Sequence, residues 1–216
     1  MTARLIRGAR VLDPYSGHDA VTDVLIADGR FAALGAHAAQ ATVPVFDAGG
    51  LWLLPGLVEL RAHLPPPHAP AGRRARELRA AAAGGYTTLA AVPDPQRSAD
   101  AELLAAQVRA DAGAGPRVVP LAALCTPGEP PQLTELGLLR AAGCVGAVQA
   151  GRALPAPVLR RAVQYAGGHG MAALLDAQDH ELAGSGCAHL GPVALRMGLT
   201  GIAVAAEELA TARAAA

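Results

Sequence analysis

Strand-like apolar runs recur at a nearly constant spacing through the C-terminal three quarters of the chain. Each interval of 27 to 31 residues holds one helical segment. Parallel strands need such crossovers, so the alternation predicts an α/β fold with a parallel sheet, most simply a (β/α) barrel. We expect residues 55–216 to form about five βα units, the N-terminal part of a TIM-type barrel. The expected strands begin near Leu57, Tyr86, Arg117, Cys144 and Met171.

Residues 1–54 carry a different pattern, which predicts β structure. The runs Arg4–Leu12, Val21–Ala27, Arg30–Leu34 and Val43–Phe46 are rich in apolar and β-branched residues. Asp28-Gly29 separates the second run from the third, and this dipeptide is a strong signal for a two-residue hairpin. The sequence therefore divides into a small β segment, residues 1–54, and the barrel segment, residues 55–216.

Turn and cap residues mark the expected helices. Gly84-Gly85 ends a helix that starts near Ala71, and the next helix is expected from Ser98 to Gly113. Pro157 occupies a position typical of a first helical turn. A last helix is expected over residues 205–215.

The first barrel strand carries the residues that most resemble a metal site. Residues 54–67 read L-P-G-L-V-E-L-R-A-H-L-P-P-P. Side chains two residues apart lie on one face of a strand, so Glu59, Arg61 and His63 share a face. Two histidines in the positions of Arg61 and His63 would form half of a metal site, but arginine has no lone pair to give a metal. The strand therefore resembles a metal-binding strand that has lost its metal.

Composition excludes several classes of protein. The formal charge is zero and no basic run with interleaved aromatics occurs, so nucleic acid is not an expected partner. No long apolar stretch or signal peptide is visible, which predicts a cytoplasmic protein without a membrane span.

All 18 residues counted as Lys+Arg are arginine, so no carboxylated lysine can bridge two metals. The three cysteines share no short metal-binding spacing and are expected to be reduced thiols: Cys125, Cys144 and Cys187.

The strand motif resembles P-G-[LVF]-[IV]-D-x-H-x-H of the amidohydrolase superfamily. Gly84-Gly85-Tyr86-Thr87-Thr88 is similar to the segment leading into the second strand of the dihydroorotases, and Leu199–Ile202 resembles a later motif of that family. The N-terminal pattern V-L-D-P…D-V-L-I-x-D-G-R resembles the small β-sandwich that precedes the amidohydrolase barrel. The resemblance thus covers the whole chain and implies a partial amidohydrolase barrel behind a β-sandwich segment.

Most functional positions of that family carry other residue types here. On the first strand, the family's aspartate falls on Glu59, its two metal histidines on Arg61 and His63, and its substrate-binding arginine on Pro65. Only His63 keeps the family's residue type. After the second strand, the family's substrate-binding asparagine falls on Asp94, whose carboxylate would repel an anionic substrate.

The functional residue types of the family are also replaced on the fourth and fifth strands. The family's acidic pair, which includes a metal ligand, falls on Gln149 and Ala150, and its fifth-strand metal histidine on Asp176. The sixth-strand histidine and the aspartate base would lie beyond residue 216. Zinc hydrolysis needs at least three protein ligands and a base, so we expect no catalytic residue and no cofactor.

Three hypotheses follow from the resemblance. The first is a catalytically inactive dihydroorotase-like protein of pyrimidine biosynthesis. It would act as a structural or regulatory partner of aspartate transcarbamoylase in an oligomeric assembly. The second is an active zinc-dependent amidohydrolase that hydrolyses a cyclic amide at an altered site, for example one using His63, His68 and His180. The third is a truncated gene product without function, since about five of eight barrel strands are present.

Overall fold

The computed structural model describes residues 3–39, 42–66, 69–70, 72–94, 115–150 and 153–215. It divides into two compact units, residues 1–56 and residues 57–216. Each unit is described by itself. No helix within these described ranges has the length and apolar character needed to cross a membrane.

The first unit is a five-stranded sheet with the order β3-β2-β1-β4, in which β5 also pairs with β1. The Asp28-Gly29 hairpin is confirmed: both residues have positive φ, 50° and 73°, as a tight turn between antiparallel strands requires. The apolar core of this first unit includes Leu5, Ala9 and Val24. The elements are β1 (Ala3–Asp13), β2 (His18–Ala27), β3 (Arg30–Leu34), α1 (Ala36–Ala39), β4 (Val45–Asp47) and β5 (Trp52–Leu53).

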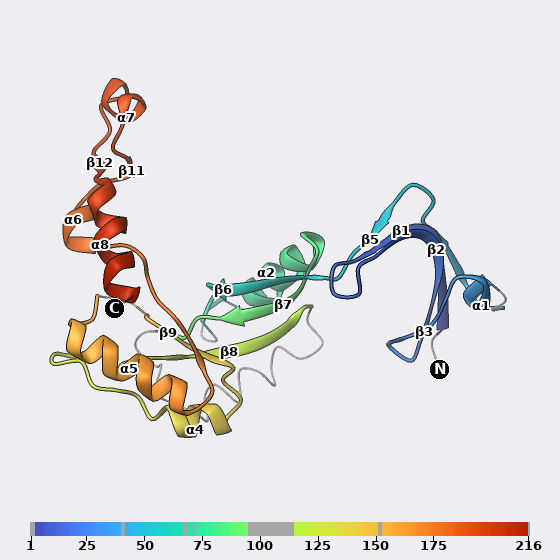
Figure 1. Ribbon diagram of the computed structural model, residues 1–216, viewed down its shortest axis with the longest axis horizontal. Coiled ribbons are helices and arrows are strands. Elements are labelled where there is room, and N and C mark those ends of the chain that lie inside the picture. Colours follow the sequence, from blue (N-terminus) through green and yellow to red (C-terminus); the bar gives the residue numbers. More distant parts are fainter. Residues whose placement is uncertain are drawn as a thin grey trace. The chain divides into compact units, whose positions relative to one another are not determined.

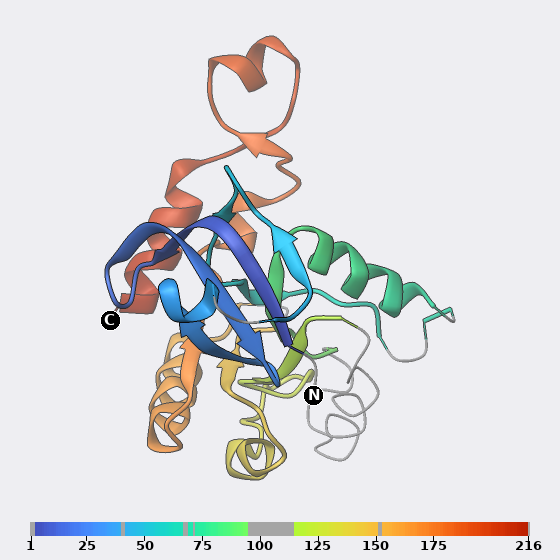
Figure 2. The same cartoon turned by 90° about the vertical axis from the view of Figure 1, so that its right-hand side faces the viewer.

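The second unit is built on a parallel sheet in which each strand pairs with the next one in sequence (Figures 1 and 2). The order is β10-β9-β8-β7-β6, so the first and last of these strands form the two edges. All carboxyl ends therefore lie at one end of the sheet, where loops carry the functional groups of such folds. The strands are β6 (Leu57–Ala62), β7 (Tyr86–Ala91), β8 (Arg117–Ala123), β9 (Gly146–Val148) and β10 (Ala172–Leu174).

Helices follow the strands of this sheet and supply much of its core. Leu136 and Leu139 of α4 and Leu159 of α5 pack with Ala147 of β9 and the fully buried Cys144. Leu78 of α2 packs separately with residues of β6, β7 and β8. The remaining elements are α2 (Arg73–Ala83), α4 (Leu136–Ala141), α5 (Ala156–Gly168), α6 (His180–Ala183), β11 (Ala188–His189), α7 (Pro192–Arg196), β12 (Gly201–Ile202) and α8 (Val204–Ala215).

The expected fold class is confirmed. The five parallel strands begin within two residues of the predicted positions, and together they form a curved half-barrel, which the N-terminal sheet precedes in the sequence. Pro157 lies in the first turn of α5, as predicted. The helix expected from Ser98 to Gly113 lies outside the described residues. The segment between α6 and α8, which forms β11, α7 and β12, was not predicted from the sequence.

Candidate functional site

The first residues of the candidate site lie on β6, at one edge of the parallel sheet. Glu59 and Arg61 are half-buried, whereas their neighbours Val58 and Leu60 are exposed, as strand alternation requires. The carboxylate of Glu59 accepts a hydrogen bond from the backbone N–H of Arg61 at 2.9 Å. Glu59 is therefore engaged by its own strand.

An ion pair links this edge of the sheet to the loop that follows the opposite edge strand. Nη2 of Arg61 lies 3.5 Å from Oδ2 of Asp176, and the two side chains are 33% and 25% exposed. Asp176 follows β10, so the pair bridges the two edges of the curved sheet. Nε of Arg61 is buried and makes no hydrogen bond. The two positions that the sequence resemblance matched to metal ligands of the family thus hold a cation and an anion that contact each other.

A histidine approaches the same carboxylate from the next helix. Nε2 of His180 lies 3.6 Å from Oδ2 of Asp176. His180 is the first residue of α6. Asp179 caps that helix by accepting from the N–H groups of Glu181 and Leu182. His63 is exposed, and His68 lies outside the described residues.

Two further positions lie just after β6 and β7. The carbonyl oxygen of Pro65 accepts a hydrogen bond from Nη1 of Arg74, a residue of α2, at 2.6 Å. Asp94 is half-buried beyond the end of β7, and the N–H of Val92 donates to the carbonyl of Ala62 at 2.9 Å. The two strands therefore present Pro65 and Asp94 at the same end of the sheet.

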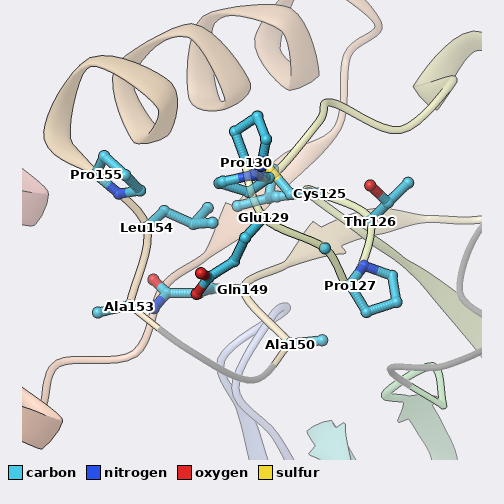
Figure 3. A pocket seen from close by; sticks show the side chains of 13 residues that line it. Cys125, Thr126, Pro127, Glu129, Pro130, Gln149, Ala150, Ala153, Leu154 and Pro155 are labelled. Carbon is cyan, nitrogen blue, oxygen red and sulfur yellow. The ribbon is translucent and has the colours of Figure 1, made fainter.

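Gln149 and Ala150 lie beside a cavity of about 610 Å³ at the carboxyl ends of β8 and β9 (Figure 3). Gln149 is only 6% exposed, and its backbone N–H donates to the carbonyl of Leu174 at 2.9 Å. The same cavity is lined by Cys125 and Glu129. Burial raises the pKa of the Cys125 thiol, which disfavours a reactive thiolate there.

The donor set of this site does not fit a catalytic zinc ion. Zinc hydrolases supply three protein ligands and leave one open position, but within the described ranges no three His, Cys, Asp or Glu residues lie close enough to hold a metal. Asp176 is engaged by a guanidinium instead. This contact was not predicted from the sequence, although Arg61 and Asp176 carry opposite charges at two positions that the resemblance assigned to one site.

The dihydro-orotase-like family model matches residues 50–215. The chain belongs to this family. Curated relatives include dihydroorotases from Geobacter sp. strain M21, 39% identical over 218 residues, and from Pelotomaculum thermopropionicum, 37% identical over 216 residues. Each alignment covers 97% of this chain and 50% of the relative. The chain therefore spans about half the length of these relatives.

Solved structures support the same fold. The L-hydantoinase (dihydropyrimidinase) from Arthrobacter aurescens aligns with a TM-score of 0.74 at 20% identity, over 99% of this chain and 50% of that one. A dihydropyrimidinase from Brevibacillus agri NCHU1002 aligns with a TM-score of 0.71 at 21% identity, over 99% of this chain and 49% of the other. The half-barrel and the N-terminal sheet are thus shared with the folds of these two proteins.

Proposed function

We propose that this dihydroorotase-like chain is catalytically inactive and serves as a structural or regulatory partner of aspartate transcarbamoylase. The βα pattern and the Gly84-Gly85 turn that resemble the family are present, whereas only His63 keeps the family's residue type among the positions matched to its metal and substrate residues. Such a pattern fits a fold retained for what it binds or holds rather than for hydrolysis.

The observation that carries the proposal is the contact between Arg61 and Asp176. A guanidinium stays protonated in proteins and repels a divalent cation. Here it also engages the one carboxylate that stands at a family metal-ligand position on the fifth strand. Zinc binding at these two positions would require breaking the ion pair and placing a metal beside a fixed positive charge. The guanidinium of Arg61 thus supplies the positive charge beside Asp176 that a metal ion would otherwise supply.

Zinc content tests the loss of catalysis. We expect the purified chain to hold far less than one zinc per molecule and to show no dihydroorotase turnover. Arg61→His combined with Asp176→His would add two histidines near His63 and is expected to raise zinc uptake, measured by mass spectrometry of the metal. Arg61→Gln with Asp176→Asn removes the ion pair without adding ligands, so it should not. Stoichiometric zinc and turnover in the unaltered chain would refute the proposal.

Co-expression tests the partner. We expect the chain to co-purify with the aspartate transcarbamoylase catalytic subunit of the same organism in a complex of fixed stoichiometry, measured by light scattering after size-exclusion chromatography. An unrelated trimeric enzyme, expressed at the same level, serves as the control for non-specific adhesion. A chain that elutes separately from the transcarbamoylase at high micromolar concentration of both would contradict the proposed partnership.

A further inference from the structure

The N-terminal sheet carries a cavity of about 320 Å³, and every residue that lines it belongs to the first unit. Residues that pair directly across a β-ladder share one face of the sheet. Val11 of β1 pairs with Leu53 of β5, and Val24 of β2 pairs with Leu34 of β3. All four residues line the cavity, so its walls are apolar and come from four strands.

One end of the cavity is polar, where the turn between β1 and β2 begins and ends. Asp13 and His18 pair there across the ladder, and Ser16 lies in the turn between them. The carboxylate of Asp13 is engaged: Oδ2 accepts from the hydroxyl of Ser16 at 2.6 Å, and Oδ1 from the N–H of Tyr15 at 3.1 Å. These two hydrogen bonds lower the pKa of Asp13, so its carboxylate is ionised at neutral pH.

His18 is the polar residue of this wall that lacks a hydrogen bond. Its ring nitrogen Nε2 is buried and has no partner in the part of the chain that the structure describes. A buried polar atom without a partner destabilises the protein that holds it. Ligand pockets are typically apolar and contain a few polar groups that orient the ligand. A ligand that supplies a hydrogen bond to His18 would therefore remove an unfavourable feature of this cavity.

The size and the walls of the cavity define the body of such a ligand. An apolar cavity of about 150 Å³ holds one benzene molecule, so a cavity of about 320 Å³ holds two fused rings. Phe31, Leu34 and Leu54 also line the cavity and are 72%, 51% and 51% exposed. A ring system that covers these side chains removes apolar surface from water, which favours binding.

The polar end of the cavity defines the functional group of the ligand. A hydroxyl group both donates and accepts hydrogen bonds, so it can pair with Nε2 of His18 in either protonation state of the ring. A carboxylate or phosphate would instead meet the ionised Asp13, and bringing two anions together in a partly buried site is unfavourable. A plain hydrocarbon would leave Nε2 without a partner.

We propose that this cavity binds a small neutral aromatic alcohol, with its fused rings against the apolar walls and its hydroxyl group on Nε2 of His18. The site lies in the first unit and shares no residue with the Arg61 and Asp176 site. The proposal therefore does not depend on the loss of catalysis or on a transcarbamoylase partner.

Equilibrium dialysis of the full chain against 2-naphthol tests the site. We expect one molecule bound per chain, with a dissociation constant in the micromolar range that a ligand of about ten non-hydrogen atoms can reach. Naphthalene has the same rings without the hydroxyl group and should bind about tenfold more weakly, because it makes no hydrogen bond to His18. 2-Naphthoate places a negative charge beside Asp13 and should also bind more weakly than 2-naphthol.

Three variants locate the binding. His18→Phe keeps a ring but removes both ring nitrogens, so it should lower the affinity for 2-naphthol about tenfold and leave that for naphthalene unchanged. Leu34→Trp places a larger side chain in the cavity wall and should abolish the binding of both. Val21→Ser is the matched control and should change neither, because Val21 is 72% exposed on the opposite face of β2 from His18 and Val24.

Far-UV circular dichroism of each variant checks that the fold is intact. Absence of saturable 2-naphthol binding below about 1 mM would overturn the proposal. Equal affinity of the wild type for naphthalene and 2-naphthol would refute the contact between the hydroxyl group and His18. Binding that survives Leu34→Trp in a folded variant would refute this cavity as the site.

Discussion

Removing the Arg61 and Asp176 ion pair offers the sharpest test of how this site is held together. At the observed separation of 3.5 Å, two unit charges attract by about 1 kcal/mol in bulk water and by about 5 kcal/mol at an effective dielectric constant of about 20. The separation exceeds that of a charge-assisted hydrogen bond, and both side chains keep some contact with water. We therefore expect a coupling of about 1–2 kcal/mol, above the usual range for exposed pairs.

A double-mutant cycle measures this coupling directly. Urea unfolding is followed for the wild type, Arg61→Met, Asp176→Asn and the double variant by circular dichroism at the helical band, because α2 and α4 to α8 all belong to residues 57–216. Raising the salt from about 0.1 M to about 1 M shortens the Debye length from about 10 Å to about 3 Å and should reduce the coupling by about half. A coupling below about 0.3 kcal/mol, the usual additivity error, would refute the inference that Arg61 neutralises Asp176.

Two further predictions concern titratable groups. Burial raises the pKa of the Cys144 thiol from the ordinary 9.0 to about 11, and it also raises the pKa of the half-buried Cys125 thiol. A disulfide-exchange reagent at mildly alkaline pH should therefore modify the exposed Cys187 first, Cys125 more slowly and Cys144 only on unfolding. Because the unfolded chain loses the Cys144 proton first, stability should fall as pH rises from about 9 toward 11. The N–H of Leu182, followed by other donors that include Arg213, lowers the pKa of Asp179. Its stabilising effect is complete above the ordinary carboxyl pKa and is lost as pH falls through the lowered value, so urea midpoints of the wild type and Asp179→Ala should converge in acid.

The sequence predicted the parts of the fold that depend on local pattern. Strands such as Leu57–Ala62 and Tyr86–Ala91 can be predicted because each is a largely apolar run bounded by proline or glycine. The Asp28-Gly29 turn follows from the ease with which these two residues adopt positive φ. Such signals involve residues that are close together in the chain, so they need no knowledge of the tertiary structure.

The contacts of the site could not be predicted in this way. Arg61 and Asp176 are far apart in sequence, and their pairing depends on how strongly the parallel sheet curves between its two edges. The segment of β11, α7 and β12, residues 188–202, was not predicted for a different reason. Its strands have two residues each and its helix has five, so no periodicity of strand or helix length develops.

The order of the parallel strands also bears on how this chain reaches its folded state. Since β6 to β10 each pair with the next strand in sequence, every βα unit can dock on the one made just before it. Contacts between sequence neighbours have a low entropic cost of loop closure and form quickly. Assembly during synthesis can therefore proceed strand by strand from the N-terminal edge. Substitutions in the loops at the carboxyl ends leave that sequence of docking steps intact, so a barrel of this kind can lose its chemistry while its folding route survives.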